Sequence, residues 1–321
     1  MYIWPLPKVE FLSLDQIVEF RPVALVTTEF EWGKLRARLR LPVAWHAFIR
    51  EATLPHWDEL SDMLQSAVDD AGVAVIYALG GGLATDAAKY LAARTGLPLV
   101  ALPTALSADV FFTSESAVRE AGCVRHIETR PPDRLVVDLD VIAAAPRHLR
   151  AAGICDVLSI ATGCWDWKFA EEEGKNPPGM GHVPYVAEAA QAILQGALAC
   201  AESAGRGEPD GLKQLLDCLA LEVQLRNQIG HSRPEKGSEH YFAYAVESEI
   251  GPELSHGELV GPGIVRMAAL QGQDSQTLRA ALHACRVPLD RIPLPVVDRT
   301  LRSLSHYAWR HDLPFGIAHT L

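Results

Sequence analysis

Three consecutive glycines, Gly80, Gly81 and Gly82, are the first residues along the chain that suggest chemistry. They follow an apolar run at residues 73–79 (VAVIYAL), which predicts a buried strand, and they precede a segment with helical spacing at residues 84–95. Glycine lets the backbone come close to a phosphate, and the start of a helix offers free N–H groups and a positive dipole end. The turn is therefore a candidate phosphate site. Because it lacks the GxGxxG pattern of the Rossmann fingerprint, a tight strand-to-helix turn without a ligand is the alternative.

A second candidate loop, residues 103–109 (PTALSAD), follows the next apolar run at residues 97–102. The hydroxyls of Thr104 and Ser107 can hydrogen-bond a cofactor phosphate or ribose, and the carboxylate of Asp109 can hold a substrate hydroxyl. The same residue types are also common in turns and at helix N-termini. These residues alone leave both interpretations open.

Candidate metal ligands lie in the second half of the chain: Asp156 (in AGICDVLS), His240 (in GSEHYFAY) and His256 (in ELSHGELVG). One carboxylate and two imidazoles suit zinc or ferrous iron, and three protein ligands leave a coordination position open for a substrate oxygen. The chain has 12 histidines, however, and no local spacing rule joins these positions. The pattern alone does not select them.

The elements that must position these residues differ between the two halves of the chain. In the first half, short β-branched runs alternate with helical segments, which predicts βαβ units and a mainly parallel sheet. The predicted strands are residues 23–26, 41–45, 73–79 and 97–102, the predicted helices are residues 59–71 and 84–95, and a hairpin lies within residues 111–137.

From about Pro146 onward, long Ala/Leu-rich segments have helical periodicity, interrupted by a Gly/Pro-rich loop at residues 173–182. The sequence therefore predicts an α/β protein with two domains. Residues 1–145 would form a Rossmann-like, parallel-sheet dinucleotide-binding domain. Residues 146–321 would form an all-helical domain that binds the metal and the substrate.

Composition limits the possible partners. The chain has 321 residues, with 29 Lys and Arg against 40 Asp and Glu, so its formal charge is −11. This acidic balance argues against nucleic acid or an anionic membrane as a partner and leaves a small molecule. The apolar runs are too short for a transmembrane helix. Six scattered cysteines without CxxC spacing and a start without a signal-peptide pattern predict free thiols in the cytoplasm.

Five segments together resemble one superfamily. Residues 80–92, 103–109 and 151–170 resemble, in the same order, the GGGxxxDxAK, PTxxSxD and GxxDxxS motifs of iron-containing alcohol dehydrogenases and dehydroquinate synthases. Residues 231–240 (HSRPEKGSEH) and 255–264 (SHGELVGPGI) are similar to stretches of sn-glycerol-1-phosphate dehydrogenases. The resemblance extends over more than half of the chain.

The resemblance implies a role for each matching position on the cofactor side. Gly80, Gly81 and Gly82 would face the pyrophosphate of NAD or NADP, and Asp86 would lie near the nicotinamide. Two further cofactor contacts would come from the second loop, namely Thr104 and Ser107. Lys89 would anchor the helix or the cofactor loop without a catalytic role.

On the substrate side, the resemblance implies four catalytic residues. Asp156, His240 and His256 would hold the metal, which is zinc or alternatively iron, and Asp109 would contact the substrate hydroxyl. Arg233 has a planar fork that suits a phosphate. The alternative for this arginine is a structural salt bridge with Glu239 or Glu247.

Two positions depart from the superfamily pattern. Cys155 stands where glycine usually precedes the metal-binding aspartate, and we interpret it as a small buried filler. The first strand ends in VTTEFEW, where NAD-using relatives carry a Gly or Asp. Glu29 is a possible ribose acceptor there, and the choice between NAD and NADP stays open.

The sequence thus predicts a metal-dependent, NAD(P)-linked dehydrogenase of a polyol or polyol phosphate, of the glycerol-1-phosphate and dihydroxyacetone phosphate type. The resemblance also implies a homo-oligomer, commonly a dimer. One alternative is a sugar-phosphate cyclase of the dehydroquinate synthase type, although those enzymes typically have Glu where this chain has Asp156. The other alternative is a non-catalytic relative that only binds a nucleotide, which metal content would distinguish.

Overall fold

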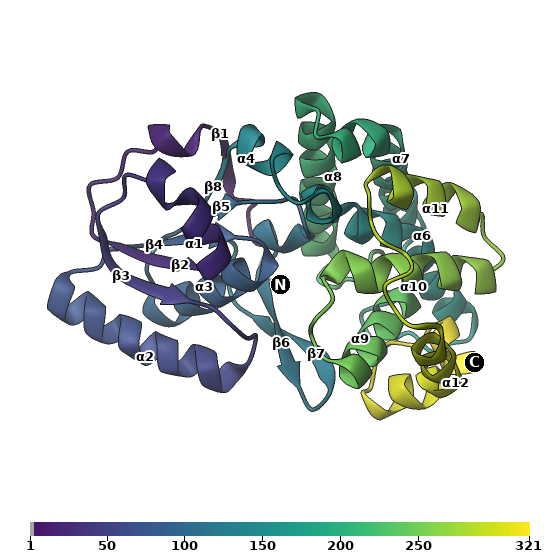
Figure 1. The fold of residues 1–321 in the computed structure, drawn as a ribbon. Coiled ribbons are helices and arrows are strands. Elements are labelled where there is room, and N and C mark those ends of the chain that lie inside the picture. The colour runs from purple at the N-terminus through teal and green to yellow at the C-terminus, as the bar shows by residue number, and fades with distance from the viewer. Residues whose placement is uncertain (1–2) are drawn as a thin grey trace. The chain divides into compact units, whose positions relative to one another are not determined.

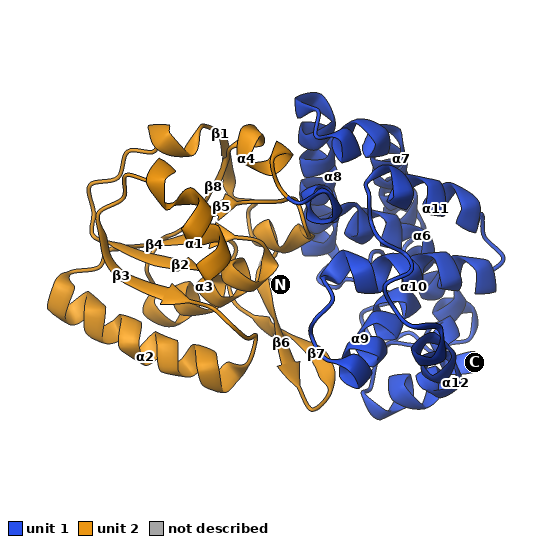
Figure 2. Cartoon of the chain, viewed as in Figure 1, with its two compact units in different colours: residues 1, 146–321 blue, residues 2–145 orange. Residues whose placement is uncertain are grey.

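A computed structural model describes residues 3–321, and the chain divides into two compact units at residues 145 and 146 (Figure 2). The first unit holds a six-stranded parallel sheet and the second is helical (Figure 1). The predicted α/β fold class with a helical C-terminal part is confirmed. No described helix is long and apolar enough to cross a membrane.

The sheet of the first unit has the strand order β1-β8-β5-β4-β2-β3, and every pairing in it is parallel. A two-stranded antiparallel hairpin is formed by β6 and β7. The strands are β1 (Lys8–Phe11), β2 (Val23–Thr27), β3 (Val43–Phe48), β4 (Val75–Gly80), β5 (Leu99–Pro103), β6 (Glu115–Glu120), β7 (Cys123–Glu128) and β8 (Arg134–Val137). The helices of this unit are α1 (Glu29–Leu35), α2 (Leu54–Ala71), α3 (Gly82–Thr95) and α4 (Leu139–Ala143), with short 3-10 turns at Leu14–Gln16, Arg36–Arg38 and Asp109–Phe111.

The central strands are continuous apolar runs because both faces of the sheet are covered. Alternate residues of β4 point to opposite sides: Ile76 and Ala78 pack with α2 and α3, whereas Val75 and Tyr77 pack with the other core cluster. Strands β2, β4 and β5 are buried at every residue. This layering fixes the carboxyl ends of β4 and β5, and therefore the two candidate loops, at the same edge of the sheet.

The second unit is built around α6, which packs against α7, α8, α9 and α10. Fourteen of the 19 residues of α6 are buried, so this helix is covered on all sides except in its last turns, where Lys168 and Glu172 are exposed. The helices are α5 (Arg147–Arg150), α6 (Ile154–Glu172), α7 (Pro184–Arg206), α8 (Pro209–Ile229), α9 (Ser238–Ile250), α10 (His256–Leu270), α11 (Ser275–Ala284) and α12 (Leu294–Arg310), followed by a 3-10 turn at Ile317–Thr320. All six cysteines are free, as the sequence predicts, and all of them are buried.

Two glycines allow close packing around α9. A Cβ at Gly163 of α6 would lie 3.0 Å from the backbone nitrogen of Lys236, just before α9. A Cβ at Gly263 of α10 would lie 2.5 Å from the carbonyl oxygen of Glu239. These contacts bring α6, α9 and α10 together at the start of α9.

We expect Gly263→Ala to lower the free energy of unfolding. The added methyl group clashes with backbone, and overpacking costs about 1–3 kcal/mol, which outweighs the gain of about 1 kcal/mol in helix propensity. Gly181→Ala is the matched control, because its Cβ would be 3.6 Å from the nearest atom, an ordinary contact. Urea unfolding midpoints of the two variants measure the difference, and equal midpoints would contradict the packing argument.

Candidate cofactor and metal sites

The glycine turn and the second candidate loop lie against each other in the first unit. Gly80 ends β4 with a φ of +152°, a backbone angle that L side chains rarely adopt. The backbone N–H of Thr104 donates to the carbonyl oxygen of Gly80 (3.3 Å), and a Cβ at Gly81 would lie 3.2 Å from Ser107 Oγ. Gly81 is the N-cap of α3 and has no side chain with which to cap it. The start of α3 can therefore offer its N–H groups to an anion.

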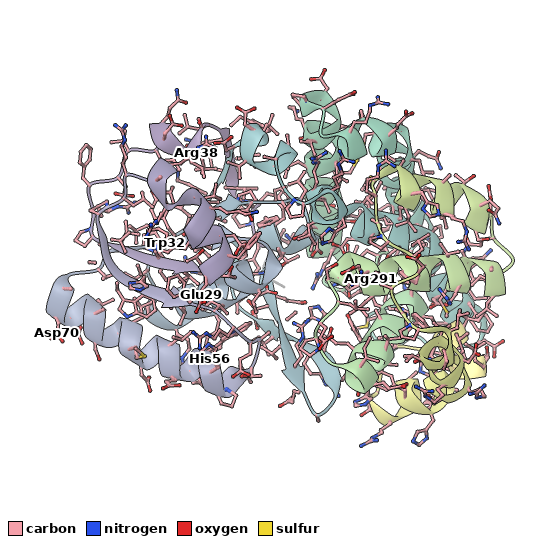
Figure 3. The ribbon with its side chains drawn as sticks, in the orientation of Figure 1. Glu29, Trp32, Arg38, His56, Asp70 and Arg291 are labelled. Carbon is pink, nitrogen blue, oxygen red and sulfur yellow. The ribbon has the colours of Figure 1, made fainter. Side chains whose placement is uncertain are left out.

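An acidic side chain of α1 faces this turn. The Cγ atom of Glu31 lies 4.0 Å from the position of a Cβ on Gly80, and its Oε2 is buried without a hydrogen-bond partner among the described residues. Burial raises the pKa of Glu31. Glu29, the ribose acceptor suggested by the sequence, lies at the start of α1 (Figure 3) and is exposed. It forms an ion pair with Arg50 at 2.7 Å. Sequence reasoning missed Glu31, although it lies only two residues beyond Glu29.

Asp86 and Lys89 form a buried ion pair on α3, with 2.9 Å between Lys89 Nζ and Asp86 Oδ1. Lys89 is fully buried, and its Nζ also donates to Thr113 Oγ1 (2.9 Å) and to the carbonyl oxygen of Glu115. Burial raises the pKa of Asp86, and the charge of Lys89 opposes that shift. Lys89 thus ties α3 to the start of β6, which agrees with the anchoring role expected for it. The nicotinamide role of Asp86 stays a prediction.

Asp109, the last residue of the second candidate loop, is buried and begins a 3-10 turn. The backbone N–H of Phe112 donates to its carbonyl oxygen (2.9 Å), and Thr113 then leads to the Lys89 contact. The 3-10 turn that Asp109 begins is therefore followed directly by a residue that contacts Lys89. Its contact with a substrate hydroxyl stays a prediction.

The three candidate metal ligands of the second unit meet in one place. Asp156 lies in the first turn of α6, His240 in the first turn of α9, and His256 is the first residue of α10. One ligand atom from each lies within 4.8 Å of the other two. Asp156 Oδ1 is 2.7 Å from His256 Nε2 and 3.7 Å from His240 Nε2.

The donor set fits a divalent metal. His240 is buried, and its Nε2 has no hydrogen-bond partner among residues 3–321. Burial opposes ionisation of Asp156, but His256 and His240 outweigh it and hold the pKa of this carboxyl well below its usual range. Burial also lowers the pKa of His240, but the neighbouring carboxylates of Asp156 and Glu239 outweigh this and raise it to about 9. The cluster therefore attracts positive charge, and its oxygen and nitrogen donors suit zinc or iron.

Cys155 stands next to this cluster but is not part of it. Its Sγ contacts the carbonyl oxygen of Gly257 at 3.9 Å, and burial raises the pKa of the thiol well above its usual range. A protonated thiol is a poor metal ligand. This geometry supports the interpretation of Cys155 as a buried filler.

Arg233 is buried and has backbone partners. Its Nη2 donates to the carbonyl oxygens of Asp166 (3.1 Å) and Phe315 (2.7 Å), so it holds the C-terminal segment against α6. The described contacts are structural, and phosphate binding by Arg233 stays a prediction.

Comparisons with known proteins decide the family. The model of the iron-containing alcohol dehydrogenase family matches residues 20–146. The glycerol-1-phosphate dehydrogenase (NAD(P)+) of Sulfurisphaera tokodaii is 30% identical over 251 residues, which cover 78% of this chain and 70% of the relative. The enzyme of the same name from Aeropyrum pernix is 31% identical, covering 78% and 69%. The chain belongs to the iron-containing alcohol dehydrogenase family.

Solved structures show that this iron-containing alcohol dehydrogenase has the fold of its relatives. A probable glycerol dehydrogenase from Sinorhizobium meliloti matches with a TM-score of 0.68 and 19% identity, covering 94% of this chain and 85% of that one. Sulfoacetaldehyde reductase from Bifidobacterium kashiwanohense, solved with NAD+, matches with a TM-score of 0.67 and 15% identity, covering 99% and 95%. The predicted superfamily and the prediction of an NAD(P)-linked oxidoreductase are confirmed.

Proposed function

We propose that this dehydrogenase interconverts sn-glycerol-1-phosphate and dihydroxyacetone phosphate, with NAD or NADP and a bound zinc or iron ion. The observation that carries the proposal is the cluster of Asp156, His240 and His256, within 4.8 Å of one another. Two relatives that this chain matches over more than two thirds of their length carry the name glycerol-1-phosphate dehydrogenase. Three ligands with an open position are typical of a catalytic site.

In the proposed site, the metal ligands and Asp109 have different roles. Asp156 supplies the anionic ligand, and His240 and His256 supply neutral nitrogens. The metal, when bound, would provide Lewis acidity toward the substrate oxygen. Asp109 would accept a hydrogen bond from a substrate hydroxyl and so fix the orientation of the reacting carbon.

The cofactor side of the proposal uses the first unit. The N–H groups at the start of α3 and the turn of Gly80, Gly81 and Gly82 would hold the pyrophosphate. Thr104 and Ser107 would complete that contact from the loop after β5. A nicotinamide, when bound, accepts or donates the hydride. Glu31 faces this turn from α1 with a buried carboxylate oxygen that has no hydrogen-bond partner among the described residues, and we assign it a contact with the cofactor ribose.

The test is hydride transfer by the purified chain. Absorbance of the reduced nicotinamide is followed with dihydroxyacetone phosphate and either NADH or NADPH, after loading with zinc or, without oxygen, with ferrous iron. Metal-dependent oxidation that a chelator stops is the expected result. Turnover of unphosphorylated dihydroxyacetone but not of its phosphate would overturn the substrate assignment, but it would still agree with a polyol dehydrogenase. No turnover with any substrate by metal-loaded protein would overturn both.

Two further assignments belong to the proposal. Six free, buried thiols are typical of a reducing compartment, which supports the cytoplasm as the location. The family resemblance supports a homo-oligomer, and light scattering of the purified chain would give its mass. A single-chain mass would contradict the predicted dimer.

A further inference from the structure

We infer that Glu239 is a positioning residue of the metal site: its carboxylate fixes the ring of His240 so that Nε2 serves as the ligand atom. This inference rests on the proposed metal-dependent function and adds a fourth residue to the three predicted ligands. Glu239 itself would not bind the metal, because its carboxylate contacts His240 Nδ1, the ring nitrogen that is not the ligand atom.

The contacts of Glu239 are all short and buried. Its Oε1 lies 2.7 Å from His240 Nδ1, and both side chains are at most 1% exposed. The same oxygen accepts from the backbone N–H of Gly237 at 2.7 Å. Its Oε2 accepts from Thr162 Oγ1 at 2.7 Å. Both carboxylate oxygens are therefore held, and the group has little freedom to turn.

These contacts decide the tautomer of His240. A carboxylate without a proton only accepts hydrogen bonds, so His240 Nδ1 must carry the hydrogen. The lone pair of a neutral ring is then on Nε2, which is the atom that faces Asp156 at 3.7 Å. A ligand histidine whose other nitrogen donates to a carboxylate is oriented and made more basic by that bond.

Thr162 links this arrangement to the other ligand helix. It lies on α6, the helix that carries Asp156, whereas Glu239 and His240 lie on α9. The hydrogen bond from Thr162 to Glu239 therefore holds the two helices in register at the cluster. Gly163, next to Thr162, permits the close approach of the chain just before α9.

A metal-binding titration of the full chain tests the inference. Zinc affinity is measured by competition with a chromophoric chelator, and the cobalt-loaded protein is compared by its visible spectrum. Glu239→Gln keeps the shape and removes the charge, and we expect zinc binding to weaken by about 10- to 100-fold with an altered cobalt spectrum. Thr162→Val removes the donor to Glu239 and should weaken zinc binding in the same direction.

Glu249→Gln is the matched control on the same helix. Glu249 is partly exposed and pairs with Arg299, so this variant should bind zinc like the wild type. Wild-type zinc affinity and cobalt spectrum in folded Glu239→Gln would overturn the inference and leave Glu239 as a cap for the first turn of α9. If Glu239→Gln does not fold, Thr162→Val decides, and unchanged affinity there would also overturn it. Failure of the wild type to bind zinc would instead overturn the proposed metal-dependent function.

Discussion

Asp156→Asn is expected to remove the metal and to lower hydride transfer at least about 1000-fold. Asp156 is the one anionic member of the cluster, and its Oδ1 lies between His256 Nε2 at 2.7 Å and His240 Nε2 at 3.7 Å. An amide has nearly the same shape but no charge to offer a divalent ion. The Lewis acidity of the ion is worth several kcal/mol of barrier, at about 1.4 kcal/mol for each factor of ten. Metal content after desalting, measured by mass spectrometry, and turnover report the two losses.

Asp109→Asn separates metal binding from substrate positioning. Asp109 lies in the first unit and is not a member of the cluster, so the variant should retain one ion per chain while its turnover falls. Asp156→Asn protein that keeps both its ion and wild-type turnover would show that the metal assignment is wrong. Loss of the ion from Asp109→Asn would show that the two carboxylates do not have separate roles.

The sheet could be predicted from the sequence because burial on both faces leaves a simple signal. Val75 to Gly80 and Leu99 to Pro103 are buried without interruption, so each reads as a continuous apolar run. Predicted and observed strands agree within two or three residues at these positions. The helix predicted at residues 59–71 begins earlier in the structure, at Leu54. Pro55 lies in its first turn, where proline is tolerated, so this proline does not mark the end of the preceding loop.

Other parts of the fold have no comparable signal. Helix α1 was not predicted, because it has only seven residues, Glu29–Leu35, includes Gly33 and buries none of them completely. Its first turn nevertheless carries Glu31, which faces the glycine turn. A residue whose role depends on the packing of a short helix against a neighbouring strand cannot be recognised from local periodicity.

The metal cluster illustrates a second limit. Asp156, His240 and His256 come from three helices, so no spacing within one element relates them. Their selection depended on resemblance, and the structure adds that the three side chains meet. From the sequence, Glu239 is only a possible salt-bridge partner for Arg233, because its contact with His240 depends on the rotamers at the start of α9. The sequence GSEH contains both residues but does not show that their side chains touch.

Lys89→Met is expected to lower the free energy of unfolding of the first unit by about 3–5 kcal/mol at pH 8. Removing one partner of a buried ion pair leaves the other charge uncompensated. Here that charge is Asp86, which is buried on α3, and the variant also loses the contacts with Thr113 and Glu115. Hydrogen exchange of the α3 amides during urea unfolding measures the loss within this unit. Lys34→Met, which changes an exposed lysine of α1, should have little effect.

The pH dependence of this loss has a definite sign. Burial already raises the pKa of Asp86 in the wild type, and removal of Lys89 must raise it further. A carboxyl whose pKa is higher in the folded than in the unfolded state favours folding when protonated, and that contribution is lost as the pH rises through the folded pKa. The deficit of Lys89→Met should therefore be smaller at pH 5 than at pH 8.

The double variant Asp86→Asn, Lys89→Met should recover part of the stability at pH 8, because it leaves neither charge of this pair buried. A deficit that does not change with pH, together with no recovery in the double variant, would mean that Lys89 stabilises the unit through its contacts with Thr113 and Glu115 rather than by compensating Asp86.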